Sequence, residues 1–174
     1  MIKRDVLLVM ETSPEQAALW KLRGRIHPEA ADVGSHVTIV FATAESTAIN
    51  PLKFSQTASR LKDDFSALRT LSFHEVRRSD DGWLWLVPGH AGRALLQGIH
   101  RSLCAFLGIA EIPDFDPHLT LGRTEKLTDQ EIKEVPKLLG GLPLKLSASS
   151  LVLEEVLAGE ASSRILQRID FSMP

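Results

Sequence analysis

The chain has little cysteine, no excess of either charge and no long apolar run, and each absence excludes a class of protein. Its single cysteine, Cys104, rules out an intrachain disulfide and fits a reducing compartment. Lys and Arg number 20 against 22 Asp and Glu, for a net charge of −2, so no strong positive field exists to hold a long nucleic acid. A nucleic-acid partner would therefore be an end or a small nucleotide.

Membrane and export signals are also missing. The longest apolar region, 94–110, is interrupted by four polar residues between positions 97 and 102, so it cannot span a bilayer. The N-terminus has only a brief apolar run, 6–10, and no small-residue cleavage site follows it. We therefore expect a soluble, cytoplasmic protein with no membrane partner.

What is present predicts alternating strands and helices within one domain, 1–174. The apolar fraction of 44% and the charged fraction of 24% are ordinary for a globular protein with one core or two small lobes. Apolar periodicity and turn residues predict strands at 6–10, 35–41, 68–77, 83–87, 117–123, 144–157 and 164–171, and helices at 14–25, 51–64, 95–107 and 128–139.

Several helix ends have recognisable signals. Ser13 and Pro14 are typical of a helix start, Gly108 of a helix stop, and Thr128 with Glu131 of a capping box. Helical spacing predicts that the first two helices bury their apolar residues, namely Ala18, Leu19, Leu22 and Ile26 in the first and Leu52, Phe54, Ala58 and Leu61 in the second.

The element order repeats approximately between the two halves of the sequence. Each half contains helices and strands arranged around one histidine-bearing strand, at 35–41 and at 117–123. This order predicts an α+β protein with two lobes related by a pseudo-two-fold axis, each an antiparallel sheet flanked by helices. We expect each half of the sequence to form one lobe.

The two histidine-bearing strands share the pattern His-x-Thr-apolar. They read SHVTIVF at 35–41 and PHLTLGR at 117–123. Side chains two apart in a strand lie on one face, so His36 joins Thr38, and His118 joins Thr120. Each strand therefore presents an imidazole beside a hydroxyl, and two such faces could enclose one anionic group.

These residue types match the requirements for opening a cyclic phosphodiester. One imidazole can take a proton from water while the other protonates the leaving sugar oxygen, a contribution of about 10²–10⁴-fold for each proton transfer. Threonine hydroxyls can donate to phosphate oxygens, and a nearby arginine can offset developing charge. Two other interpretations are buried structural histidines and a metal-binding pair. The metal is the weaker rival because no HxH, CxxC or carboxylate cluster supplies a third ligand, so we expect no metal and no cofactor.

At these residues the chain resembles the 2H phosphoesterases, which are named for two His-x-Thr/Ser motifs. Within them it is most similar to the branch of 2′,5′ RNA ligases and cyclic-nucleotide phosphodiesterases. The resemblance covers nearly the whole chain and includes GWLWLVPG at 82–89 before a long helix. Pro117 and Arg123, on either side of the second motif, match that branch well, whereas the first motif is a looser match.

The resemblance implies a bilobal fold with both motifs facing a central cleft. It also implies metal-independent action on a 2′,3′-cyclic phosphate, typically giving the 2′-phosphate. Carried over by position, His36 would be the general acid and His118 the general base. Thr38 and Thr120 would hold the phosphate, and Arg123 would stabilise its charge.

Aromatic residues near the motifs are weaker candidates for substrate binding. Trp83 and Trp85 share one strand face, so one of them, with Trp85 preferred, could stack on a base. Phe41 ends the first motif strand and could line the cleft. The alternative interpretation of each of these aromatic residues is that it packs in the hydrophobic core. The histidines outside the motifs, among them His27, are interpreted as loop, surface or helix residues.

The sequence thus predicts a cyclic phosphodiesterase that acts on RNA ends or small nucleotides, with 2′,5′ ligation as a side activity. A rival from another class is a module of the same fold that binds a nucleotide or RNA end without turnover. A third interpretation is a structural domain whose two motifs coincide by chance. The physiological substrate and the oligomeric state have no readable signal.

Overall fold

The computed structural model describes residues 2–11, 14–28, 34–61, 68, 70–157 and 163–171. It confirms the predicted α+β class. The strands are β1 (Ile2–Met10), β2 (His36–Val40), β3 (Leu71–Arg78), β4 (Trp83–Pro88), β5 (Leu119–Arg123), β6 (Leu144–Leu146), β7 (Ala148–Leu157) and β8 (Ser163–Asp170). The helices are α1 (Ala17–Ile26), α2 (Pro51–Arg60), α4 (His90–Leu107) and α5 (Asp129–Leu138), with short 3-10 helices η1 (Pro14–Gln16), η3 (Glu45–Ala48) and η4 (Thr124–Lys126).

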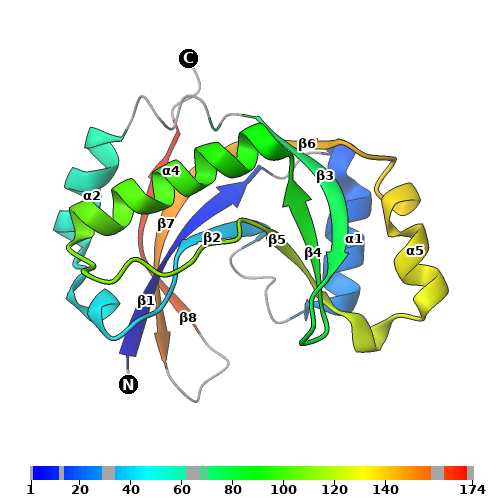
Figure 1. Ribbon diagram of the computed structural model, residues 1–174, viewed down its shortest axis with the longest axis horizontal. Helices are drawn as coiled ribbons and strands as arrows, with labels where there is room; N and C mark the ends of the chain where they lie inside the picture. Colours follow the sequence, from blue (N-terminus) through cyan, green and yellow to red (C-terminus); the bar gives the residue numbers. More distant parts are fainter. Residues whose placement is uncertain are drawn as a thin grey trace.

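The strands form one antiparallel sheet in the order β6-β3-β4-β5-β2-β1-β7-β8 (Figure 1). The two motif strands, β2 and β5, are neighbours at its centre. Their ladder consists of a single pair, Val37 opposite Leu119, whereas β1 pairs with β7 along its whole length. The two predicted sheets are therefore the four-stranded halves of one sheet, joined at the junction between β2 and β5.

The halves of the sheet are not the halves of the sequence, so that prediction is wrong. The β3–β4 hairpin comes from the first half of the sequence but pairs with β6 and β5 of the second half, and β7 of the second half pairs with β1. The predicted strand 144–157 is in fact two strands separated by Ser147, with β6 beside β3 and β7 beside β1. Apolar patterning missed this break because it reports which face is buried and carries no information about the partner strand.

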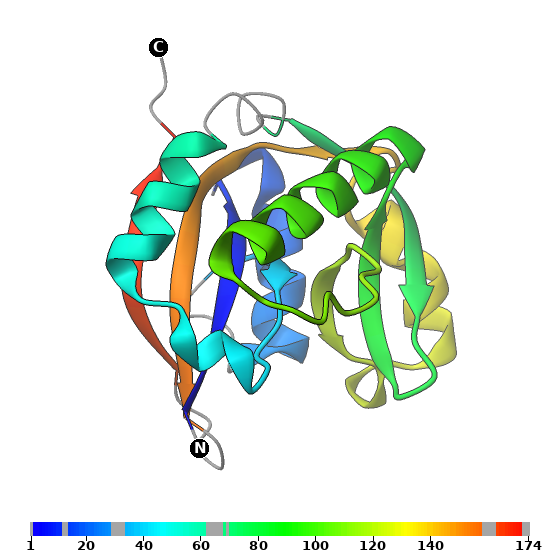
Figure 2. The same cartoon turned by 60° about the vertical axis from the view of Figure 1, so that its left-hand side comes forward.

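Two of the helices pack across the junction between the two halves of the sheet. α1 follows β1 but contacts β5, and α4 follows β4 but contacts β2. α2 packs against α4, β7 and β8, while α5 packs against β3 at the far side of the molecule (Figures 1 and 2). Each motif strand is thus covered by a helix whose preceding strand belongs to the other half. No helix in the described ranges is long and apolar enough to cross a membrane.

The predicted helix ends are largely confirmed. Gly108 follows α4 in the left-handed conformation, with φ 78°. Thr128 and Glu131 form both hydrogen bonds of a capping box at the start of α5. The predicted N-cap, Ser13, lies outside the described residues. Local sequence therefore determined where these two helices begin or end.

Two of the residues predicted to be buried are exposed. Leu19 in α1 and Phe54 in α2 are buried as predicted, but Ala18 is exposed and the Leu52 side chain is 70% exposed. Each exposed residue lies close in sequence to buried ones but points to a different side of its helix. The buried apolar faces of α1 and α2 are therefore narrower than the spacing of their apolar residues predicted.

The strands bury one face in the main core, and β1 and β7 bury both faces over part of their length. Val6 and Leu8 belong to the main core, whereas Leu7 and Val9 face the other side and form a small separate cluster with Val152 of β7. This second cluster matters for function, because Leu7 and Val9 are on the face that carries the first motif.

Candidate active site

The four motif side chains lie on one face at the centre of the sheet. Val37 is directly opposite Leu119, and an antiparallel register through that pair sets His36 across from Thr120 and Thr38 across from His118. Directly opposite side chains on a shared face have Cβ atoms about 4.5–5.5 Å apart. All four are half-buried, whereas Val37 and Leu119 are buried on the other face. We call the side bearing these four residues the site face.

Both imidazoles are held in the same way. Nδ1 of His36 donates to the Gly34 carbonyl at 3.0 Å, and Nδ1 of His118 donates to the Asp116 carbonyl at 2.7 Å. A carbonyl can only accept, so the proton of each neutral ring is on Nδ1 and the basic nitrogen is Nε2. Each histidine therefore has its second nitrogen available for proton transfer, with the ring orientation fixed by the main chain two residues earlier.

The surroundings of His36 disfavour its charged form. Its neighbour on β1 is Val9, part of the second apolar cluster. The pKa of His36 is lowered to about 4, mainly by burial; the bond to Gly34 opposes this change, and the charges of Arg23, His27 and His118 add to it. His36 is therefore neutral at neutral pH and suited to accept a proton.

The surroundings of His118 are more favourable to a proton. Burial lowers its pKa and the nearby charge of Arg77 adds to this, but the bond to the Asp116 main chain and the carboxylates of Asp116 and Asp81 oppose the change. The Trp85 indole is stacked on the imidazole, with ring centroids 4.0 Å apart and planes 18° apart. An aromatic face attracts a cation, so this contact also favours the imidazolium.

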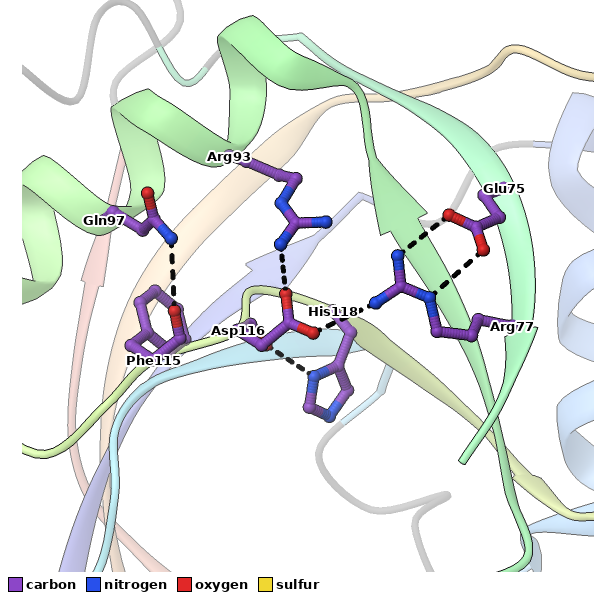
Figure 3. Close-up of polar contacts among 7 residues, drawn as sticks. All are labelled: Glu75, Arg77, Arg93, Gln97, Phe115, Asp116 and His118. Carbon is purple, nitrogen blue, oxygen red and sulfur yellow. Dashed lines mark hydrogen bonds and ion pairs between the residues drawn. The ribbon is translucent and has the colours of Figure 1, made fainter. Parts of the chain in front are cut away.

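Asp116 is anchored by two arginines from different elements (Figure 3). Arg77 of β3 is 3.1 Å from Oδ2 and Arg93 of α4 is 2.8 Å from Oδ1. Arg77 also makes a two-point contact with Glu75, at 3.1 and 2.9 Å. Because the Asp116 carbonyl holds His118, this cluster fixes the segment that orients a motif histidine. Its two arginines and two carboxylates carry no net charge.

Arg123 reaches the site face through a bulge in β5. It is three residues from Thr120, so simple alternation would put the two on opposite faces. The pairing with β4 shifts there, because Trp85 is opposite Thr120 whereas Trp83 is opposite Arg123. The Arg123 guanidinium lies 3.8 Å from the centre of the Trp83 ring and donates to the Asp81 carbonyl at 3.1 Å.

Two aromatic residues lie elsewhere than their sequence positions suggested. Phe41 packs edge-on against Phe115 at 5.7 Å and belongs to the margin of the main core, so we leave it out of the proposed site. His27, interpreted from sequence as a loop residue, lies edge-on to Trp83 at 5.4 Å, and its charge acts on His36. His27 is therefore part of the site surroundings.

Comparison with known families gives one match, which covers most of the chain. The family described as the 2′-5′ RNA ligase superfamily matches this chain over residues 11–160. No curated protein sequence matches the chain.

Solved structures are similar over the full length. One, described as a phosphoesterase, is 16% identical with a TM-score of 0.56, covering 99% of this chain and 100% of that one. Escherichia coli LigT complexed with 3′-AMP is 17% identical with a TM-score of 0.56, at the same coverage. LigT complexed with phosphate is 16% identical, with a TM-score of 0.53 and again that coverage. These likenesses establish the fold.

Proposed function

The chain belongs to the 2′-5′ RNA ligase superfamily, and from this premise we propose that it hydrolyses 2′,3′-cyclic phosphates of RNA ends or small nucleotides to 2′-phosphates. The observation that carries the proposal is the shared face of His36, Thr38, His118 and Thr120, with each imidazole held through Nδ1 so that its Nε2 is the basic nitrogen. Reverse 2′,5′ ligation follows from the same chemistry as a side activity. These side chains supply an acid, a base and phosphate donors, so the reaction needs no metal.

The proposed reaction is an in-line attack of water on the cyclic phosphate. One imidazole takes a proton from the water as its oxygen bonds to phosphorus. The P–O3′ bond breaks, and the other imidazole gives its proton to the leaving O3′. The hydroxyls of Thr38 and Thr120 donate to the non-bridging oxygens, and Arg123 at the edge of the site face offsets negative charge.

The charges around the two rings favour His36 as the base and His118 as the acid. Arg23 and His27 oppose a proton on His36, whereas the carboxylates near His118 favour one. This is the reverse of the division that the family resemblance implies. We adopt it because a base must begin the reaction neutral and an acid must begin it protonated.

A small nucleotide fits what is known of similar structures. LigT of Escherichia coli has been solved with 3′-AMP, with ATP and with NADP⁺. The balanced net charge of this chain also favours a short ligand over a long nucleic acid.

The proposal is tested with a nucleoside 2′,3′-cyclic phosphate in the presence of a chelator, with identification of the product isomer. We expect turnover to survive chelation and to fall at least about a thousandfold in His36→Ala and in His118→Ala. His90→Ala is the matched control, because His90 is exposed at the start of α4. Binding without turnover would instead indicate a nucleotide-binding module, and neither binding nor turnover would indicate coincidental motifs.

A second experiment assigns the two histidines. A nucleoside p-nitrophenyl phosphodiester has a leaving group that needs no proton, so losing the general acid matters little with it. We expect His118→Ala to keep most of its activity on this substrate and His36→Ala to lose it. The opposite result would restore His36 as the acid.

A further inference from the structure

A buried arginine outside both motifs joins the two motif strands. Arg23 of α1 is only 5% exposed. Its Nε donates to the main-chain carbonyl of Thr120 at 3.0 Å, and one terminal nitrogen donates to the Ser35 hydroxyl at 2.8 Å. Ser35 immediately precedes His36, and Thr120 is the threonine of the second motif. One side chain therefore contacts both halves of the candidate site.

These two hydrogen bonds lie at the junction where the fewest residue pairs join neighbouring strands of the sheet. The ladder between β2 and β5 consists of one residue pair, Val37 and Leu119. The spacing of the motif strands thus depends on few main-chain bonds. A planar guanidinium with two donors in fixed directions can set the distance between two acceptors, which a single hydrogen bond cannot do.

The charge of Arg23 has no matching carboxylate. Other arginines of the protein, such as Arg4 and Arg93, pair with Glu155 and Asp116. Within the described ranges no ion pair involves Arg23, and its two hydrogen-bond acceptors are neutral. Burial lowers its pKa to about 10, so it stays charged at neutral pH. Burying an unpaired charge costs free energy, which favours a role in which an anion completes the arrangement.

We propose that Arg23 is a positioning residue that fixes the spacing of the two motif strands and supplies the buried positive charge that an anionic phosphate on the site face balances. The inference rests on the proposed function and extends it to a residue that belongs to neither motif. It also gives the protein a means of keeping His36 neutral until substrate binds. The charged groups that act on His36 are Arg23 of α1, His27 just after α1 and His118 just before β5.

The geometry separates two contributions of Arg23, and two variants can distinguish them. Arg23→Lys keeps the charge but loses the fork that reaches both acceptors. Arg23→Met loses both. Arg25→Met is the control, because Arg25 lies two residues along the same helix with its side chain 52% exposed and paired with Glu131. Thermal unfolding of each variant reports whether the fold is intact.

The measurements are the dissociation constant of inorganic phosphate, the pKa of His36 from an NMR titration, and kcat on the cyclic phosphate. In Arg23→Met we expect phosphate binding to weaken about tenfold, the pKa of His36 to rise, and kcat to fall. In Arg23→Lys we expect phosphate binding and the His36 pKa to stay close to wild type while kcat falls. Arg25→Met should change none of the three.

Several outcomes would overturn the proposal. One is an Arg23→Met protein with unchanged phosphate binding and an unchanged His36 pKa. If Arg23→Met does not fold, Ser35→Ala removes one of the two bonds and keeps the charge, and an unchanged kcat in that variant would contradict the spacing role. Phosphate binding and the His36 titration do not require turnover. A protein inactive on cyclic phosphates would therefore refute the proposed function and leave the Arg23 measurements to be judged separately.

Discussion

The indole of Trp85 lies parallel to the imidazole of His118, with ring centroids 4.0 Å apart. One face of the indole is therefore occupied by a motif histidine. The sequence suggested that Trp85 stacks on a substrate base, but the stack within the protein points to a role in holding His118. The two roles differ in which kinetic constant they affect.

We expect Trp85→Leu to lower kcat about 3–30-fold with little change in KM, because the stack orients His118 and favours its imidazolium. Trp85→Phe keeps an aromatic face and should stay within about threefold of wild type. Steady-state kinetics on a cyclic nucleotide and on a cyclic phosphate without a base provide the measurement. A higher KM on the nucleotide alone would restore base stacking.

Asp116 should influence His118 through both its main chain and its charge. Its carboxylate favours the His118 imidazolium, and it is held by Arg77 and Arg93. We expect Asp116→Ala to lower the pKa of His118 and to reduce kcat severalfold, as measured by NMR titration and kinetics. Glu75→Gln is the control, since Glu75 contacts Arg77 but not His118. Equal effects of both substitutions would mean that Arg77, and not Asp116, controls the histidine.

The pH dependence of kcat/KM should be bell-shaped with its maximum on the acid side of neutrality. Both histidine pKa values lie below the usual 6.5, and that of His36 is about 4. The rate should fall as the pH rises through the lowered pKa of His118, where the acid loses its proton, and it should fall below about pH 4 as His36, the base, gains one. A profile that is flat from pH 5 to 8 would count against paired acid and base catalysis.

Gly122 allows the bulge that brings Arg123 to the site face. A Cβ at this position would lie 2.5 Å from the Ile26 carbonyl oxygen, and φ is 152°. We expect Gly122→Ala to reduce the free energy of unfolding by about 3 kcal/mol, through strain and overlap with α1. Gly98→Ala is the control, because a Cβ there meets nothing within 4 Å. It should be neutral or stabilise α4 by about 0.5–1 kcal/mol. Urea unfolding measures both, and equal midpoints would contradict the packing argument.

Asp5 should make the protein less stable as the pH rises. It faces Glu154 across β1 and β7, and burial followed by the Glu154 charge raises its pKa from 3.8 to about 7. The folded state then binds a proton that the unfolded chain has released, so stability is lost as the pH rises from about 4 through 7.

We expect the stability of Asp5→Asn relative to wild type to increase between pH 5 and pH 8 by an amount on the order of 1–3 kcal/mol, as measured by urea unfolding. The exposed Asp114→Asn provides the control. The two histidines make stability change with pH in the opposite direction. Their pKa values are lowered in the folded state, so the unfolded chain binds protons first and the protein loses stability as the pH falls below 6.5. That trend is common to both proteins and cancels in the comparison. An Asp5→Asn protein destabilised equally at both pH values would rule out the buried proton.

The sequence by itself determined the local features of this protein. His36 alternates with Val37, and His118 alternates with Leu119. This alternation predicted a motif face and a core face on each strand, and the structure has both faces. The stop at Gly108 was also readable, since it depends only on neighbouring residues. Such signals need no knowledge of the partner element.

The tertiary structure decided how the two motifs meet and what surrounds them. The pairing of β2 with β5, the bulge before Arg123 and the packing of α1 across to β5 each join residues far apart in sequence. Arg23 and Asp116 have no sequence signal because their contacts with the motifs exist only after these elements pack. Residue types and periodicity predict what each strand offers to a site. The charge around each histidine, and hence its expected role, is set by the register and by the helix that covers the strand.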